Sequence, residues 1–237
     1  MERFFIKNFK ITFSDGINDP IFDTFAFMNQ IEEIATKIKN RLKRPLPGTS
    51  AHLKMATKFR LNELKSGYDV SKAKKSGVLI SLYPNNGSLF FLLIERQKDR
   101  GIHSGQISFP GGAMEKSDKD YFETAIREAN EEVGLKKEDI NIIGSLTELY
   151  IPPSNFLVFP VVGYLNSKPI PVPDPNEVAG IIEADLTKLL NSVNVKWKKI
   201  EVRGHKIKAP YFDINGYTVW GATAMILNEL IEIIKSS

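Results

Sequence analysis

The chain has 237 residues, 42% of them hydrophobic, so it can bury the core of one domain plus an extension, or of two small domains. It has no cysteine, which excludes disulfides, thiolate metal sites and cysteine nucleophiles, and its formal charge of +4 suits an anionic substrate or a solvated surface. No run of about 18 apolar residues could span a bilayer, and the N-terminus lacks the order of a signal peptide. We therefore expect a cytoplasmic protein with no membrane partner.

The N-terminal part predicts a helix followed by a linker. From residue 21 to about 43, apolar side chains recur every three to four positions, which is typical of a helix with one buried face. The next segment, residues 48–76, is polar, rich in lysine and without a clear period. We expect residues 1–75 to form a helical extension and linker, and residues 76–237 to form the main domain.

The main domain predicts strands interleaved with helices, and therefore a mixed sheet with helices on both faces. In chain order we expect a hairpin formed by "GVLISLYP" and "SLFFLLIER", a glycine-bearing loop before residue 112, a helix from about Asp120 to Val133, strands near 140–150 and 157–165, a proline-rich loop at 169–175, a short helix around Leu186–Leu190, a hairpin at 196–208 and a final helix from Trp220.

The hairpin "KWKKIEVRGHKIK", residues 196–208, is basic. Its near alternation of basic and apolar residues is typical of a half-buried antiparallel pair, and it also gives a weak indication of nucleic-acid binding. No helix-turn-helix or basic stripe accompanies it, so we do not expect a nucleic-acid partner.

The helix ends in an acidic stretch, "REANEEVG", residues 127–134. Glu131 and Glu132 stand three and four positions after Glu128, so the three carboxylates share one arc of the helix and repel one another. Either the charges are solvated beside Arg127 and nearby lysines, or they bind a divalent cation such as Mg²⁺ or Mn²⁺. The glycines of "FPGG", residues 109–112, would let the backbone approach a metal or phosphate closely.

The segment "GGAMEKSDKDYFETAIREANEEVGL", residues 111–135, resembles the Nudix box. The Arg-Glu-apolar-x-Glu-Glu-x-Gly-apolar ending matches at every fixed position. The front half is one residue longer than the common form and has Asp118 where glutamate is usual, a variation that resembles the coenzyme A pyrophosphatase branch. The upstream run, residues 92–112, and landmarks at 151–163, 175–180 and 220–224 are also similar to that branch, although Ile94, Gln97 and Arg100 depart from its pattern.

The resemblance covers about residues 76–235 and implies a Nudix α/β/α sandwich with a mixed sheet. It further implies an enzyme that uses Mg²⁺ or Mn²⁺ to cleave coenzyme A or an acyl-coenzyme A into 3',5'-ADP and a phosphopantetheine. Two alternatives stay open: hydrolysis of another nucleoside diphosphate derivative such as ADP-ribose or NADH, and a non-catalytic module that senses a nucleotide. Assembly as a homodimer is also left open.

By the same resemblance, the expected metal ligands are Glu128, Glu131, Glu132 and the carbonyl of Gly111. Arg127 would orient Glu128 or its neighbours, or form a plain surface salt bridge. The general base would be Glu131 or Glu177, and for Glu177 the alternative is a favourable charge at a helix N-terminus. The substrate phosphates would meet Arg96, Arg100 and His103.

Overall fold

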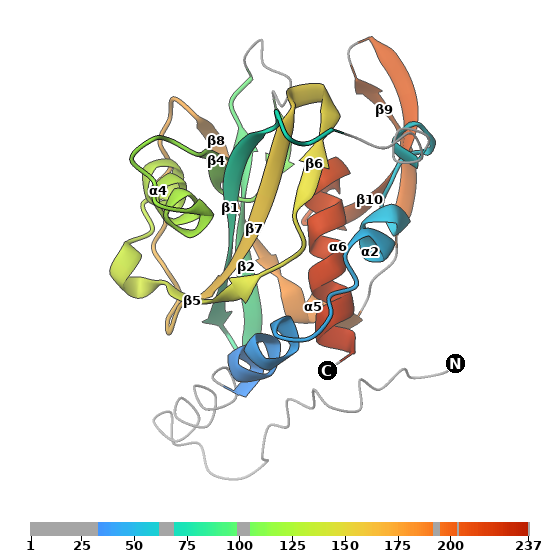
Figure 1. Cartoon of the computed structure of the whole chain (residues 1–237). Coiled ribbons are helices and arrows are strands. Elements are labelled where there is room, and N and C mark those ends of the chain that lie inside the picture. The colour runs from blue at the N-terminus through green and yellow to red at the C-terminus, as the bar shows by residue number, and fades with distance from the viewer. Residues whose placement is uncertain (1–32, 62–68, 99–104, 192–194, 203, 237) are drawn as a thin grey trace, which may run out of the picture.

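The computed structural model describes residues 33–61, 69–98, 105–191, 195–202 and 204–236. An eight-stranded mixed sheet lies between helices on its two faces, and a second, three-stranded sheet lies at one side (Figure 1). This arrangement confirms the predicted α/β/α sandwich. Within the described ranges, no helix is both long and apolar enough to cross a membrane.

The large sheet has the strand order β3-β2-β1-β7-β5, with β4 paired to β1, β6 to β7 and β8 to β2. Strands β1 and β7 run parallel, and the other pairs are antiparallel. The strands are β1 (Lys74–Asn85), β2 (Ser88–Arg96), β3 (Ile107–Ser108), β4 (Gly111–Ala113), β5 (Asn141–Ser145), β6 (Leu149–Ile151), β7 (Phe156–Tyr164) and β8 (Val178–Asp185).

The hairpin between β1 and β2 confirms the turn predicted there. Asn86 and Gly87 both have positive φ, 46° and 76°, as the two-residue turns of tight hairpins require. The strand region predicted near 140–150 is divided into two strands, β5 and β6, which both pair with β7. Between them the chain leaves the sheet so that Thr147 can donate hydrogen bonds to Glu229.

Helix α4 (Tyr121–Val133) covers one face of the large sheet. The Asp120 side chain caps its first turn by accepting from the backbone N–H groups of Phe122 and Glu123. Its buried Ala125, Ala129 and Val133 pack with side chains of β1, β2 and β7, and Gly134, at φ 69°, provides the left-handed cap expected at its end. A short 3₁₀ helix, η1 (Lys137–Asp139), follows.

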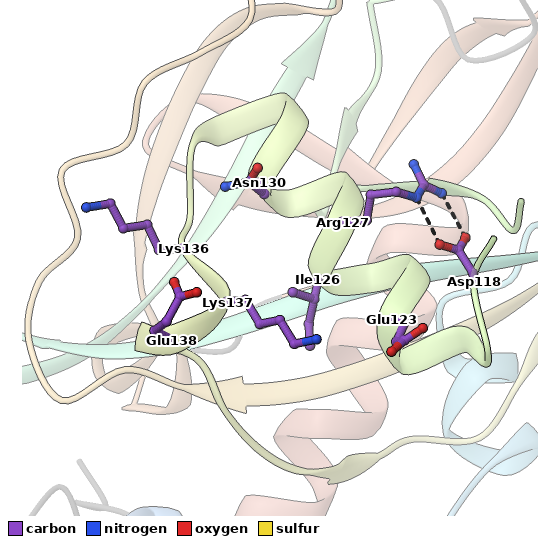
Figure 2. A pocket seen from close by; sticks show the side chains of 8 residues that line it. All are labelled: Asp118, Glu123, Ile126, Arg127, Asn130, Lys136, Lys137 and Glu138. Atoms are coloured by element: carbon purple, nitrogen blue, oxygen red, sulfur yellow. Dashed lines mark hydrogen bonds and ion pairs between the residues drawn. The ribbon is translucent and has the colours of Figure 1, made fainter.

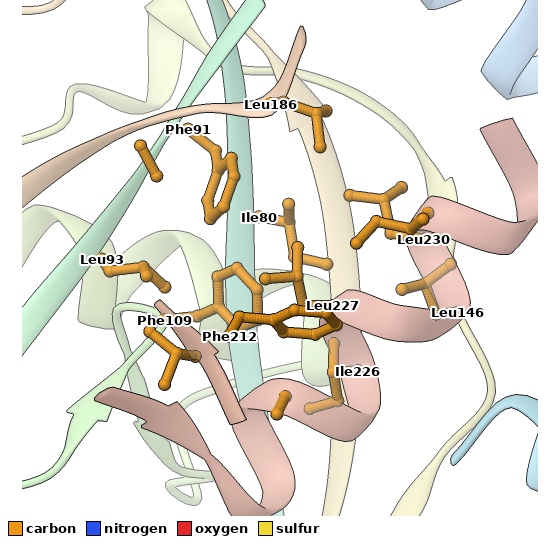
Figure 3. Close-up of a cluster of buried hydrophobic side chains, with 14 of the residues drawn as sticks. Ile80, Phe91, Leu93, Phe109, Leu146, Leu186, Phe212, Ile226, Leu227 and Leu230 are labelled. Carbon is orange, nitrogen blue, oxygen red and sulfur yellow. The ribbon is translucent and has the colours of Figure 1, made fainter. Parts of the chain in front are cut away.

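The opposite face is covered by α6 (Gly221–Lys235) and the small sheet of β9 (Lys196–Val202), β10 (His205–Ile214) and β11 (Tyr217–Trp220). Phe91 and Phe109 meet Phe212 and Leu227 in the core between the two sheets and α6 (Figure 3). A second 3₁₀ helix, η2 (Pro152–Ser154), and the short helix α5 (Leu186–Asn191), which was predicted, complete the domain.

The segment before β1 is more ordered than predicted. Residues 33–42 are helical and bury Ile38, whereas the earlier part of the predicted helix lies outside the described residues. The interpretation of residues 48–76 as a linker is wrong at α2 (Thr49–Lys54), which packs against α6 and buries Ala51 and His52. The helix is short and its buried residues are few, so no period could be recognised in the sequence.

Candidate active site

The acidic end of α4 lies beside β4 and the end of β2. Glu132 is the most deeply buried of the three glutamates, with 1% of its side chain exposed. One of its carboxylate oxygens accepts from the backbone N–H of Gly111 at 2.7 Å, and the other from Arg96 at 3.0 Å. Two residues that are far from Glu132 in the sequence therefore hold its carboxylate in place.

Burial favours the protonated form of two acids of this site, Glu128 and Glu132. Burial raises the pKa of Glu132 to about 7, against the lowering effects of the Gly111 N–H and of Arg96, and the charges of Glu128 and Glu177 raise it further. Burial also raises the pKa of Glu128, while Arg127 opposes the rise. Since Arg96 and Arg127 between them contact the four carboxylates of Asp118, Glu128, Glu131 and Glu132, the site holds more acidic groups than basic ones.

Arg127 joins the two ends of the acidic motif. Its Nε and Nη2 atoms donate to the two oxygens of Asp118, both at 3.0 Å (Figure 2), and its Nη1 atom lies 2.9 Å from both Glu128 and Glu131. Nη2 also donates to the carbonyl of Ala113 at 3.0 Å. The guanidinium group lowers the pKa of Asp118 to about 2. Because Asp118 is only 5% exposed, this network is more than a plain surface salt bridge.

Gly112 brings the backbone of β4 against Glu128. A Cβ atom at this position would lie 2.3–2.5 Å from all three atoms of the Glu128 carboxyl group. The second glycine of "FPGG" thus leaves room for the Glu128 carboxyl group, which a Cβ atom at this position would displace.

We expect Gly112→Ala to reduce activity by displacing Glu128, with only a small loss of stability, because Glu128 is a side chain that can move away. Steady-state kinetics and thermal melting of the same preparation check this result. The matched control is Gly216→Ser, since a Cβ atom at Gly216 meets nothing within 4 Å, although its φ of 86° adds some backbone strain. Equal loss of activity in both variants would contradict the assigned contact.

Glu177 stands at the end of the proline-rich loop, just before β8. The loop is fixed to the end of α4, since Val172 and Asp174 donate backbone hydrogen bonds to the carbonyls of Val133 and Glu132 at 2.9 and 3.0 Å. The Glu177 carbonyl accepts from the backbone N–H of Gln97 at 2.9 Å. The alternative of a charge at a helix N-terminus is therefore wrong, because a strand follows. Strand β8 itself was missed, since its short apolar run has no clear period.

The donor chemistry of the site fits a hard divalent cation. Glu128, Glu131 and Glu132 offer carboxylate oxygens, and the excess of acidic groups described above is what such a cation offsets. Within the described part of the chain, no three acidic or imidazole side chains converge closely enough to hold a metal as they stand. In this structure Arg96 contacts Glu132, and Arg127 contacts Glu128 and Glu131, so the carboxylates must turn toward one another to bind a metal.

The structure brings together most of the residues that the sequence singled out. Arg96 contacts Glu132, and Gly111 donates to it, whereas Arg100 and His103 lie outside the described residues. Two contacts were not predicted from the sequence: the bidentate contact between Arg127 and Asp118, and the close packing of Gly112 against Glu128. The position of Asp118 inside the acidic motif was the available signal for the first of them.

Comparisons with known proteins identify the family of the chain. A model of the NUDIX domain matches residues 73–201. "Nudix hydrolase 15, mitochondrial" of Arabidopsis thaliana is 37% identical over 166 residues, which are 67% of this chain and 58% of that protein. "Nudix hydrolase 22, chloroplastic" of the same plant is 35% identical and matched over 54% of its length. The chain thus spans somewhat more than half of these two relatives.

A bacterial relative is matched over most of its length. The "Uncharacterized Nudix hydrolase NudL" of Pectobacterium atrosepticum is 32% identical over 73% of this chain and 90% of that protein. Among solved structures, a C. elegans Ap4A hydrolase in a binary complex is similar with 21% identity and a TM-score of 0.41, covering 49% of this chain and 83% of that one. The domain match and these sequence identities show that the chain belongs to the Nudix hydrolase family.

Proposed function

We propose that the protein is a metal-dependent pyrophosphohydrolase that cleaves the diphosphate of a nucleoside diphosphate derivative. The observation that carries this proposal is the buried Glu132, fixed by Gly111 and Arg96 beside Glu128. Burying an ionisable carboxylate near two others destabilises the folded protein, so its presence points to a ligand that offsets the charge.

In this proposal Glu128, Glu131 and Glu132 hold Mg²⁺ or Mn²⁺, with the Gly111 carbonyl as a further ligand. A bound divalent cation neutralises charge on the phosphate oxygens and lowers the pKa of a water molecule. Arg127 keeps Glu128 and Glu131 in position through the bidentate contact with Asp118.

The general base is Glu131 or Glu177. Glu131 is 55% exposed, so its carboxylate can reach a water molecule that attacks phosphorus. Glu177 would approach from the loop that is fixed to the end of α4. Arg96, whose side chain is 31% exposed, would contact the substrate phosphates together with Arg100 and His103.

The substrate we favour is coenzyme A or an acyl-coenzyme A. Its support is the sequence signature around Leu92, Leu93, Arg96, Gly105 and Phe109, which resembles the coenzyme A pyrophosphatase branch. ADP-ribose and NADH are the rival substrates, and a nucleotide-sensing module is the rival role. The complete set of metal carboxylates favours an enzyme, because a sensor has no need to keep all three.

The cytoplasmic location and the assembly as a homodimer stay predictions. Two relatives are named as a mitochondrial and a chloroplastic protein.

The test is product analysis by mass spectrometry. The full chain is incubated with Mg²⁺ or Mn²⁺ and with coenzyme A, acetyl-coenzyme A, ADP-ribose, NADH or ATP in separate reactions. Appearance of 3',5'-ADP and phosphopantetheine, dependent on metal, supports the reaction and the substrate. Cleavage of ADP-ribose or NADH alone would support the proposed reaction and reject coenzyme A as the substrate. If none of the five compounds is cleaved, the proposed hydrolysis is rejected for all of them.

Glu131→Gln should abolish turnover and leave the melting temperature almost unchanged, because Glu131 is largely exposed and its main contact is Arg127. Kinetics and thermal melting are measured on the same sample. The control is Glu138→Gln, which makes the same change at an exposed position of η1. Near-normal activity of Glu131→Gln would remove this residue from the site.

A further inference from the structure

The small sheet carries a basic surface that the proposed reaction does not use. Strand β10 lies between β11 and β9, so β9 is an edge strand, and Figure 1 shows it at the outer border of the molecule, away from α4. Phe212, Ile214 and Val219 anchor β10 and β11 in the core, whereas the side chains from Lys196 to Lys199 are exposed. This part of β9 is therefore accessible from outside.

The two faces of the β9–β10 ribbon differ in how their lysines are used. Directly opposite residues of an antiparallel pair share a face. On one face Lys196 forms an ion pair with Asp213 at 2.8 Å, and Lys198 donates to Thr218 at 2.5 Å and lies over the Tyr211 ring. The lysines of this face are thus satisfied within the protein.

The other face, formed by Trp197, Lys199, Glu201, Lys206 and Lys208, is named here the Trp197 face. Lys199 and Lys208 are directly opposite, an arrangement of like charges that destabilises a sheet. Among the described residues, none of the ion pairs involves a lysine of this face. Its cations are therefore available to an external anion.

An aromatic ring accompanies these cations. Trp197 is 51% exposed, and the Lys208 ammonium group lies 5.6 Å from its ring centroid. Val195, just before β9, is 38% exposed. Exposed tryptophan next to lysines is typical of side chains that enter the headgroup region of a bilayer, where the indole ring lies at the interface and the ammonium groups meet phosphate.

We propose that the Trp197 face docks onto an anionic phospholipid surface. Charge complementarity supports this partner, because the Trp197 face presents Lys199, Lys206 and Lys208 against the single carboxylate of Glu201, and each lysine near an anionic membrane surface contributes about 1 kcal/mol. The expectation of no membrane partner was based on the lack of a spanning segment, and the present proposal departs from it.

Two other partners fit the Trp197 face less well. A single-stranded nucleic acid binds through successive aromatic rings along a basic groove, whereas the described part of this face has one exposed ring, that of Trp197. A second copy of the chain would place the same lysines against one another, and like charges repel.

The test is co-sedimentation of the full chain with vesicles of phosphatidylcholine alone and of phosphatidylcholine with phosphatidylserine. We expect binding to the anionic vesicles only, with release at high salt and a blue shift of tryptophan emission. The double variant Lys199→Glu with Lys208→Glu should weaken binding by about tenfold or more. The matched control, Lys136→Glu with Lys137→Glu, makes the same charge change on the other side of the molecule and should bind almost as well as the wild type.

Trp197→Ala separates the contribution of the indole ring from that of the lysines. It should weaken binding and abolish the blue shift, while the salt dependence of binding remains. Hydrolysis of soluble substrate should be unchanged in every hairpin variant. The proposal is overturned by equal losses in the two double variants, by tighter binding to single-stranded RNA than to vesicles, or by an increased KM for soluble substrate in the hairpin variants.

Discussion

Glu132→Gln should reduce turnover by more than about 100-fold. Loss of a residue that only hydrogen-bonds a metal ligand costs about 10- to 100-fold, and Glu132 is itself a proposed ligand. The carboxylate is 1% exposed and is fixed by Gly111 and Arg96, so no other side chain can take its place. The fold should survive, since the amide oxygen of glutamine can still accept from the Gly111 N–H. Arg96, which is 31% exposed, can turn to solvent.

The same substitution should change the pH dependence of stability. The pKa of Glu132 is raised to about 7 in the folded protein from its ordinary value of 4.5, so this group binds a proton on folding. Its stabilising contribution is fully present below about pH 4.5 and is lost as the pH rises through about 7. Without metal, we therefore expect Glu132→Gln to gain stability relative to the wild type between pH 5 and pH 8, by on the order of 3 kcal/mol at most.

Urea denaturation at several pH values, with a chelator present, measures this difference. Addition of Mg²⁺ at pH 8 should stabilise the wild type and leave Glu132→Gln almost unchanged. Asp139→Asn, an exposed carboxylate on η1, serves as the control and should alter neither curve. A stability difference that does not depend on pH would show that Glu132 does not titrate in this range and would contradict its raised pKa.

The second large effect is expected at Glu229, which is fully buried in α6. Its carboxylate accepts from the Gly48 N–H at 3.0 Å, from the Thr147 hydroxyl at 2.6 Å and from the Thr147 N–H at 3.2 Å, and His52 Nε2 lies 2.9 Å away. Glu229→Ala removes this partner from the buried Gly48 and His52 and from the half-buried Thr147. We expect a loss of about 3–5 kcal/mol in the free energy of unfolding.

Denaturant unfolding gives this loss directly, with circular dichroism to follow helix content. Glu232→Ala is the matched control, because Glu232 lies three residues further along the same helix but is 26% exposed and pairs with Lys54. The control should lose less than about 1 kcal/mol. Similar losses in the two variants would mean that the buried contacts of Glu229 contribute little.

Elements whose conformation is determined by their own short segment could be predicted from the sequence. Helix α4 was predicted with nearly correct ends, because Asp120 caps its start and Gly134 its end. The hairpin between β1 and β2 was predicted because Asn86 and Gly87 adopt positive φ easily. Helix α2 and strand β8 were missed, because partners distant in the sequence, α6 and β2, determine their conformation.

The same distinction applies to the site. Glu128, Glu131 and Glu132 could be grouped from spacing along one helix, and the resemblance to the Nudix box gave them a role. The contact between Arg96 and Glu132 joins residues 36 positions apart, and spacing cannot predict such a contact. Burial separates three glutamates that look equivalent in the sequence, since the exposed fraction of their side chains runs from 1% at Glu132 to 55% at Glu131.

The attachment of the proline-rich loop to α4 restricts where its length can vary. The hydrogen bond from Asp174 to the Glu132 carbonyl fixes the chain three residues before Glu177, and Gln97 holds it again at Glu177. An insertion before Val172 would bulge into solvent and leave these anchors in place. An insertion or deletion between Asp174 and Glu177 would change the distance between Glu177 and the helix. Natural variation in loop length should therefore be confined to the part that precedes Val172.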